Sequence, residues 1–172
     1  QSLWQHAIVT ANCSEALATK FGMESKLAFI AGLLHDVGKI VMVNIITTMY
    51  ADKAERLLKS PDVLVKAIDP LAPIIGLHVI QHWKLARGLT FSTLFVDAPN
   101  STPADENIKA LVHCVRLASD IASMKGYGVL GQEKASFDNH PSIDYIGTTP
   151  DELTRVAAEF DEMIDSFLGA IG

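Results

Sequence analysis

The sequence predicts an all-α protein. Apolar residues recur at helical spacing along most of the 172-residue chain, residues typical of helix caps and breaks separate these stretches, and no segment shows the convincing alternation of a β-sheet strand. Apolar residues make up 49% of the chain and charged residues 20%, which is enough for a substantial core. The length fits one domain, or one domain with a short appendage.

The first part of the chain predicts three helices. The first covers residues 3–21, ends before Gly22, and has the inward stripe Leu3, Ala7, Thr10, Cys13, Ser14, Leu17 and Phe21. A second is expected over residues 26–34, with a break near Asp36–Gly38. The third should run from Lys39 to about Lys59 and end before Ser60-Pro61.

Two further stretches follow in the middle of the chain. Residues 71–85 form an apolar helical pattern with Pro73 near its start. Residues 88–95 are ambiguous, because threonine, phenylalanine and valine suit a strand although the neighbouring segments are helical. A loop is expected at 97–102.

The last part predicts two more helices. Thr102-Pro103-Ala104-Asp105 should open a long helix that ends at Gly126 and has the stripe Ile108, Leu111, Val112, Val115, Ala118 and Ala122. Residues 129–147 look irregular. The sequence Thr149-Pro150-Asp151-Glu152 then resembles a capping box at the start of a C-terminal helix.

Charge and composition exclude several classes of protein. The net charge is −6 and no cluster of Lys and Arg occurs, which argues against duplex nucleic acid as a partner. No apolar run reaches the length needed to span a bilayer, since Val37–Ile46 is too short, and no secretory signal is seen. Cys13 and Cys114 lie within predicted helices and read as buried thiols of a reducing compartment. We therefore expect a cytoplasmic protein without membrane contact.

One polar cluster stands out in this apolar background. His35-Asp36 ends the run Leu27–Leu34, and His6 lies on the inward stripe of the first helix. Isolated buried charge is costly, whereas imidazole and carboxylate groups are good ligands for divalent metals. The alternative is an ordinary core histidine, His6, hydrogen-bonded to Asp36. Either way, the three side chains should meet.

The motifs around these residues resemble a known superfamily. Trp4-Gln5-His6 and the run Ala28–Lys39, which reads AFIAGLLHDVGK, resemble the HD metal-dependent phosphohydrolases, and most closely the HDOD (HD-related output domain) subgroup. Weaker similarity continues through Gly76 and Trp83 to Val115–Ala118. The resemblance implies an HD-like helical bundle over residues 1–128, with 129–172 an irregular segment and a helix that packs on the same domain. Such domains usually carry a further helical segment before the Trp-x-His helix, so the chain is expected to be a fragment or to diverge there.

The resemblance also implies a metal site. His6, His35 and Asp36 match ligands of the catalytic relatives, and Lys39 matches a lysine that can contact a phosphate. Ala72 and Val96-Asp97 stand where further histidines are expected. The late aspartate of the family falls at Ser119, one residue before Asp120, and helical phase turns Asp120 away toward His113. Asp120 is nevertheless kept as a fourth candidate ligand.

Several other polar and aromatic residues have simpler explanations. His78 and His82 have the i, i+4 spacing of a chelating pair but no evident third ligand. Three basic residues at three-residue spacing, Lys53, Arg56 and Lys59, favour a solvated helix face. Trp4 and Trp83 are expected to be core anchors, and His140 is expected to lie in a loop.

The resemblance implies a regulatory module of bacterial signal transduction, and the missing ligands predict that its metal site is degenerate and not catalytic. No cofactor is expected, although a divalent ion (Mn, Fe, Zn or Mg) would be needed if the site is functional. The resemblance implies receiver domains, cyclic-dinucleotide enzymes or other signalling proteins as partners, and allows a nucleotide ligand. The alternative is a metal-dependent nucleotide or cyclic-nucleotide phosphodiesterase using His6, His35, Asp36 and Asp120. A purely structural domain is the third reading.

Overall fold

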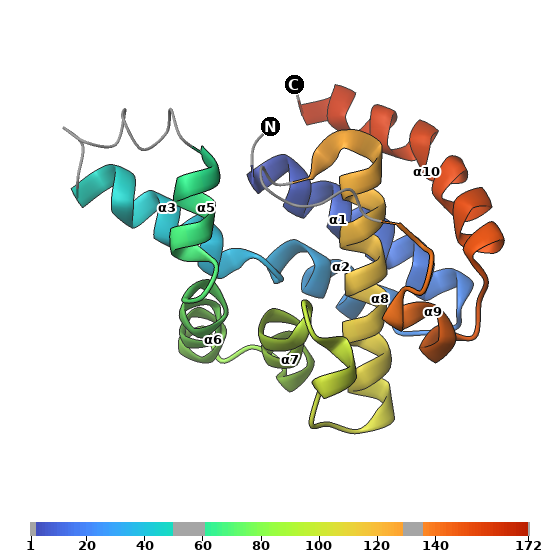
Figure 1. Cartoon of the computed structure of the whole chain (residues 1–172), viewed down its shortest axis with the longest axis horizontal. Helices are drawn as coiled ribbons and strands as arrows, with labels where there is room; N and C mark the ends of the chain where they lie inside the picture. Colours follow the sequence, from blue (N-terminus) through green and yellow to red (C-terminus); the bar gives the residue numbers. More distant parts are fainter. Residues whose placement is uncertain (1–2, 50–60, 129–135, 172) are drawn as a thin grey trace.

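The computed structural model describes residues 3–49, 61–128 and 136–171, and all regular structure in these ranges is helical (Figure 1). The chain begins with α1 (Leu3–Lys20), α2 (Ser25–Leu34) and α3 (Val37–Met49). Gly22 is left-handed (φ +70°) and ends the first helix as predicted. The Glu24 carboxylate accepts hydrogen bonds from the first amides of α2. The predicted end of the third helix, with Lys53, Arg56 and Lys59, lies outside the described residues.

Three helices occupy the middle of the chain, α5 (Pro61–Ile68), α6 (Ala72–His82) and α7 (Arg87–Phe95). The structure resolves the ambiguity at residues 88–95 in favour of a helix. Pro73 lies in the first turn of α6, where its missing N–H has no consequence. The sequence pattern did not predict α5, which starts at Pro61.

The long helix α8 (Glu106–Ala122) begins later than the sequence indicated, because Asp105 and not Thr102 caps it by accepting a bond from the Ile108 amide (3.1 Å). It runs into the turn η2 (Ser123–Tyr127). The segment expected to be irregular contains a short helix, α9 (Pro141–Ile146), and the predicted loop before α8 contains the 3₁₀ turn η1 (Pro99–Ser101). The last helix is α10 (Pro150–Ile171), capped by Thr149 as predicted.

The core lies where α1 packs between α2, α8 and α10 (Figure 1). Buried residues of α10, among them Leu153, Val156 and Phe160, belong to the same core cluster as Leu17 of α1 and Val115 of α8. The C-terminal helix therefore contributes to this core. The helices α3, α5 and α6 form the other end of the molecule.

Two glycines allow the helix crossings that build this arrangement. A Cβ added to Gly32 of α2 would lie 2.6 Å from Ser14 Oγ and 2.8 Å from Ala11 Cα of α1. A Cβ on Gly38 of α3 would lie 1.8 Å from the carbonyl oxygen of Ala72 in α6. Any larger residue would push these helices apart, so the two glycines of the AGLLHDVGK run set the positions of the elements on either side of His35-Asp36.

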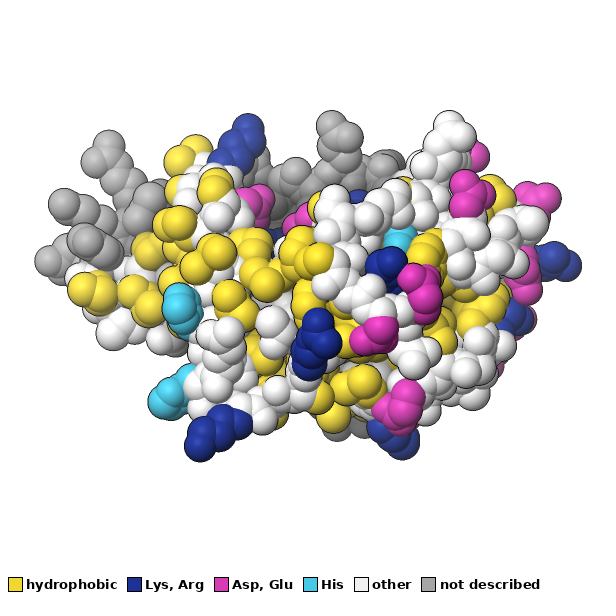
Figure 2. All heavy atoms as spheres, turned by 90° about the horizontal axis from the view of Figure 1, so that it is seen from below, with side chains coloured by type: hydrophobic (Ala, Val, Ile, Leu, Met, Phe, Trp, Pro, Cys, Tyr) yellow, Lys and Arg dark blue, Asp and Glu magenta, His cyan; other side chains and the backbone are white. Residues whose placement is uncertain are grey.

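Two predictions about surface and core were wrong. Trp4 and Trp83 are 58% and 54% exposed, not core anchors. Trp4 is two residues from His6 and so falls about 200° around the helix from it, while Trp83 lies just past the end of α6. Figure 2 shows hydrophobic side chains gathered over the end where α3, α5 and α6 lie, and the exposed ones there include Ile45, Met49, Val63 and Ile74.

The chain contains an apolar stretch that is longer than the sequence pattern predicted. Within the described residues, Ser25–Met49 is long and apolar enough to cross a membrane by length and composition, because α2 and α3 follow each other with only His35-Asp36 between them. Core helices of soluble proteins meet the same criterion. This stretch contains Asp36 and Lys39, whose charges are costly in hydrocarbon.

Candidate metal centre

The three predicted residues meet in the interior. His6 comes from the first turns of α1, and His35 and Asp36 form the junction between α2 and α3. Asp36 Oδ2 lies 3.4 Å from His35 Nε2 and 3.9 Å from His6 Nε2, and the two imidazole rings are 5.3 Å apart. One potential ligand atom from each residue lies within 4.8 Å of the others. All three are buried, at 0%, 4% and 5% exposure, so the predicted meeting is confirmed.

Hydrogen bonds on the far side of each ring define its tautomer. His6 Nδ1 lies 2.8 Å from the Tyr127 carbonyl oxygen, and His35 Nδ1 lies 2.7 Å from the Gly32 carbonyl oxygen. Since a carbonyl oxygen can only accept, each neutral ring carries its proton on Nδ1. The Nε2 atoms then hold lone pairs, and both face Asp36. Metal-binding histidines are commonly oriented in this way by a partner on the other ring nitrogen.

The inward-facing atoms lack the partners that buried polar atoms normally have. Among the described residues, His35 Nε2 and Asp36 Oδ2 have no hydrogen-bond partner. Only His6 Nε2 has one, the Ser119 hydroxyl at 3.2 Å. With both rings neutral, the two Nε2 atoms and Asp36 Oδ2 converge as electron-pair donors, and the Ser119 hydroxyl donates to His6 Nε2. This arrangement fits a divalent cation, because imidazole nitrogen and carboxylate oxygen suit Mn, Fe or Zn.

The ionisation of the cluster follows from its burial and its neighbours. Burial and the proximity of His35 lower the pKa of His6 to about 4, so His6 is neutral at pH 7. Burial opposes ionisation of Asp36, but attraction to His35 and Lys39 outweighs it, and the pKa of Asp36 lies below its ordinary value. Burial likewise opposes the charge on Lys39, and Asp36 overcomes it and raises the lysine pKa. Asp36 and Lys39 thus form a buried ion pair.

Lys39 is occupied by carboxylates. Its ammonium nitrogen lies 3.0 Å from Asp36 Oδ1 and 3.8 Å from Asp69 Oδ1, and the lysine side chain is only 12% exposed. The phosphate contact that the resemblance implied for Lys39 would therefore have to compete with two carboxylates. Of the two, only the Asp36 carboxylate lies within hydrogen-bonding distance of the ammonium group, which has three N–H donors, so the phosphate contact of Lys39 stays a prediction.

A small cavity adjoins the cluster, with a volume of about 10 Å³. It is lined by His35, Asp36, Gly38, Lys39, Asp69, Ala72, Pro73, Thr93, Val96 and Asp97. Ala72 and Val96-Asp97, the positions where the resemblance places further histidines, thus border the cluster, and of these three residues only Asp97 has a side-chain ligand atom. A cavity of this size holds about one water molecule at most.

Asp120 does not join the cluster. Its Oδ2 accepts hydrogen bonds from His140 Nε2 and Arg116 Nε, both at 2.6 Å. Those two partners lower the pKa of Asp120 although burial acts in the opposite direction. Ser119 contacts His6 instead, as helical phase indicated. The structure therefore does not group Asp120 with the other three candidate ligands, and its carboxylate belongs to another hydrogen-bond network.

The sequence reading missed that network. His140 is 7% exposed and caps α9, its Nδ1 accepting the Ser142 amide hydrogen at 3.1 Å. The Ser142 hydroxyl bonds His113 Nδ1 at 2.9 Å, so the network holds α9 against α8. A histidine directly before Pro141 at the start of a helix was the available signal. His78 and His82, by contrast, are exposed and belong to no group of three ligands among the described residues.

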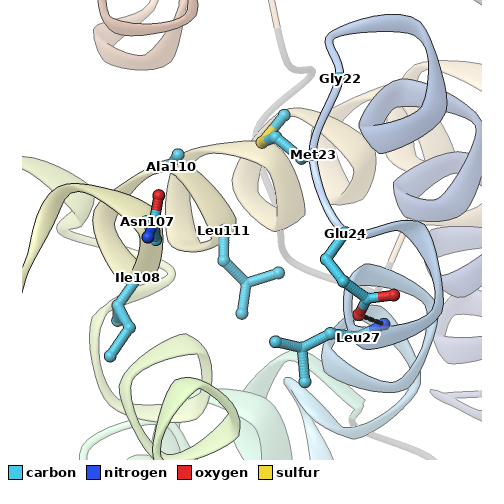
Figure 3. Close-up of a pocket in the computed structure, with 8 residues that line it drawn as sticks. All are labelled: Gly22, Met23, Glu24, Leu27, Asn107, Ile108, Ala110 and Leu111. Carbon is cyan, nitrogen blue, oxygen red and sulfur yellow. Dashed lines mark hydrogen bonds between the residues drawn. The ribbon is translucent and has the colours of Figure 1, made fainter.

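A larger hollow of about 380 Å³ lies elsewhere, between the turn after α1 and the start of α8. Figure 3 shows Met23, Leu27, Ile108 and Leu111 around it, with the Glu24 carboxylate already bonded to the Leu27 amide. It shares no lining residue with the cluster, and its one carboxylate is used in capping. The candidate site is therefore the buried cluster.

Comparison with protein families gives a match over the first part of the chain. The HDOD domain family model matches residues 1–99, which include His6, His35 and Asp36. The chain belongs to the HDOD domain family. Among proteins of curated function, none matches it.

Two solved structures share the HDOD fold. One is an HDOD domain protein of unknown function from Geobacter sulfurreducens, with a TM-score of 0.69 and 20% identity over 98% of this chain and 61% of that one. The other, described as a "putative signal transduction protein" from Marinobacter aquaeolei, has a TM-score of 0.73 and 20% identity over 99% of this chain and 38% of that one. The chain thus spans less than two thirds of either protein.

Proposed function

We propose that this HDOD domain is a regulatory module of bacterial signal transduction whose HD-type site is degenerate and non-catalytic. The observation that carries the proposal is the surroundings of the cluster. The resemblance places ligands of a two-metal centre at Ala72, Val96 and Ser119, which lie beside the cluster, and the first two have apolar side chains. A hydrolytic centre also needs an open position for water and room for its substrate. A cavity of about 10 Å³ offers no room for a phosphate ester.

The cluster has the donors for one ion. His6, His35 and Asp36 would hold it through Nε2, Nε2 and Oδ2, and such an ion would act as a Lewis acid. Lys39 opposes this binding, because its ammonium group neutralises Asp36 from 3.0 Å. We therefore expect at most one ion, weakly held.

Charge around the cavity also disfavours a phosphate substrate. Asp69 and Asp97 line it together with Asp36, and Lys39 is the one cation among the lining residues. Asp97 is partly compensated by Arg116, at 3.4 Å. An anion approaching this opening meets more negative than positive charge, so repulsion adds to the lack of space.

A second function remains supported by one observation. The unpartnered His35 Nε2 and Asp36 Oδ2 are what a metal-dependent phosphohydrolase would present in its metal-free state. Such an enzyme, acting on nucleotides or cyclic nucleotides, is the alternative. Asp120 would take no part in it.

The setting of the module is also proposed. HDOD membership favours action in the bacterial cytoplasm beside receiver domains, cyclic-dinucleotide enzymes or other signalling proteins, with a nucleotide as a candidate ligand. The net charge of −6 gives no support to duplex nucleic acid as a partner. We propose no membrane partner.

The test combines elemental analysis of protein purified without chelator with hydrolysis of a general phosphodiester, bis(p-nitrophenyl) phosphate, in the presence of Mn²⁺, Zn²⁺ or Mg²⁺. We expect less than one equivalent of metal and no turnover above that of the free ion. The matched controls are Asp36→Asn, in the cluster, and Asp69→Asn, at the cavity rim. Metal-dependent turnover that Asp36→Asn abolishes and Asp69→Asn retains would overturn the proposal and favour the phosphohydrolase.

A further inference from the structure

The turn η2 brings a backbone carbonyl to the buried cluster from 121 residues away. It follows α8 directly, and within it Gly126 has φ +88° and ψ 8°, in the left-handed region that residues with a side chain adopt at a cost. This conformation ends the helical path, and the next carbonyl, that of Tyr127, meets His6 Nδ1 at 2.8 Å. The turn therefore contacts the cluster through its main chain.

The turn is braced on both sides. The Ser123 hydroxyl donates to the Ser119 carbonyl at 3.0 Å, and Lys125 forms an ion pair with Asp161 of α10. The Tyr127 side chain is partly buried and packs against the core. Such bracing fixes the position of the Tyr127 carbonyl relative to α1.

Without this carbonyl, His6 would have a better hydrogen bond on its other side. A neutral histidine can place its proton on Nε2, and a bond from Nε2–H to the Asp36 carboxylate would be charge-assisted and strong. In the structure the Nε2–Oδ2 separation is 3.9 Å, too long for that bond, and Nδ1 is engaged instead. The position of Tyr127 therefore works against collapse of His6 onto Asp36.

We propose that Ser123–Tyr127 is a positioning element: the Tyr127 carbonyl, placed by left-handed Gly126, holds His6 as the Nδ1–H tautomer and keeps its Nε2 lone pair facing Ser119 and Asp36. This inference concerns how His6 is held, and it stands whether or not the domain hydrolyses phosphate esters. Gly126 and Tyr127 lie outside the sequence motifs, and in this proposal they orient the ligand atom of His6.

The test reads the His6 tautomer by ¹⁵N NMR of the imidazole at pH 7, without added metal, in the whole chain. The His6 signal is assigned by its absence in His6→Gln. Wild type should show Nδ1–H. Gly126→Ala, which strains the left-handed residue and displaces the carbonyl, should shift the tautomer ratio toward Nε2–H by about five-fold or more, the equivalent of a hydrogen bond of roughly 1 kcal/mol.

Gly147→Ala is the matched control. Gly147 is also left-handed (φ +76°), an added Cβ there meets nothing within 4 Å, and it lies after α9. It should lower the melting temperature comparably and leave the His6 tautomer unchanged. Gly126→Asn should restore the wild-type tautomer, because asparagine tolerates the left-handed region better than alanine. An Nε2–H tautomer in wild type overturns the proposal even if Gly126→Ala fails to fold, and so does a folded Gly126→Ala whose tautomer ratio matches that of Gly147→Ala.

Discussion

Replacement of Asp36 by alanine should destabilise the protein. Asp36 is 5% exposed and its Oδ1 lies 3.0 Å from the Lys39 ammonium group. Hydrogen bonds to charged groups contribute about 1.5–3 kcal/mol, and breaking a buried ion pair on one side costs about 3–5 kcal/mol. Lys39 keeps Asp69 at 3.8 Å and some contact with solvent, so we expect the lower part of this range.

The expected loss is therefore about 2–3 kcal/mol, which for a domain of this size corresponds to a fall in melting temperature of about 4–12 °C. Thermal melts of wild type and Asp36→Ala with chelator present, beside a phosphodiesterase assay, measure it. The control is Asp69→Ala, whose 47% exposed carboxylate should contribute less than about 1 kcal/mol. An Asp36→Ala protein that melts as high as wild type and loses measurable hydrolysis would refute the reasoning, because a carboxylate kept for catalysis can be destabilising.

Three further predictions follow from the same geometry. Gly38→Ala should lower the free energy of unfolding by about 3 kcal/mol or more, or prevent folding, because its Cβ would collide with the Ala72 carbonyl. The control is Gly169→Ala, whose Cβ would meet nothing within 4 Å, and this variant should melt at or above the wild-type temperature. Two tightly held transition metals per chain in elemental analysis would contradict the degenerate site. The pKa values of His6 and His113 are both lowered to about 4 in the folded protein. The unfolded chain therefore binds protons at a higher pH than the folded protein, and the free energy of unfolding should fall as pH drops from about 6.5 to 4. The slope should be up to about 1.4 kcal/mol per pH unit for each histidine. Urea unfolding at pH 7, 6 and 5 should show this slope, reduced by one proton in His6→Gln, and an unchanged slope in that variant would contradict the assignment to His6.

The meeting of His6, His35 and Asp36 could be predicted from sequence for a specific reason. His6 lies on the apolar stripe of α1, and His35-Asp36 ends an apolar run, so both had to face the core. The sequence also placed Ala72, Val96 and Ser119 beside the site. Helical phase and the match of a few motif residues were enough to align these positions with the family pattern.

Other features depend on contacts that local patterns do not encode. Trp4 is an exception, because its phase of about 200° from inward-facing His6 already indicated exposure, and only its hydrophobicity suggested a core position. His140 looked like a loop residue, yet it caps α9 and binds Asp120, a partner 20 residues earlier on a different helix. The contact of the Tyr127 carbonyl with His6 could not be predicted from a sequence motif, because every residue at that position has a backbone carbonyl.

His6, His35 and Asp36 differ from Ala72 and Val96 in what their loss would do to the fold. His6 binds η2 through Tyr127, His35 binds the end of α2 through Gly32, and Asp36 neutralises buried Lys39. Removal of any one leaves a buried partner unsatisfied, at about 1–3 kcal/mol for a neutral group and more for a charged one. Ala72 and Val96 have no polar partner to lose and contribute apolar surface to the packing of α3, α6 and α7. A site that has lost its catalytic role would therefore keep His6, His35 and Asp36 for structural reasons, so their presence alone does not indicate catalysis.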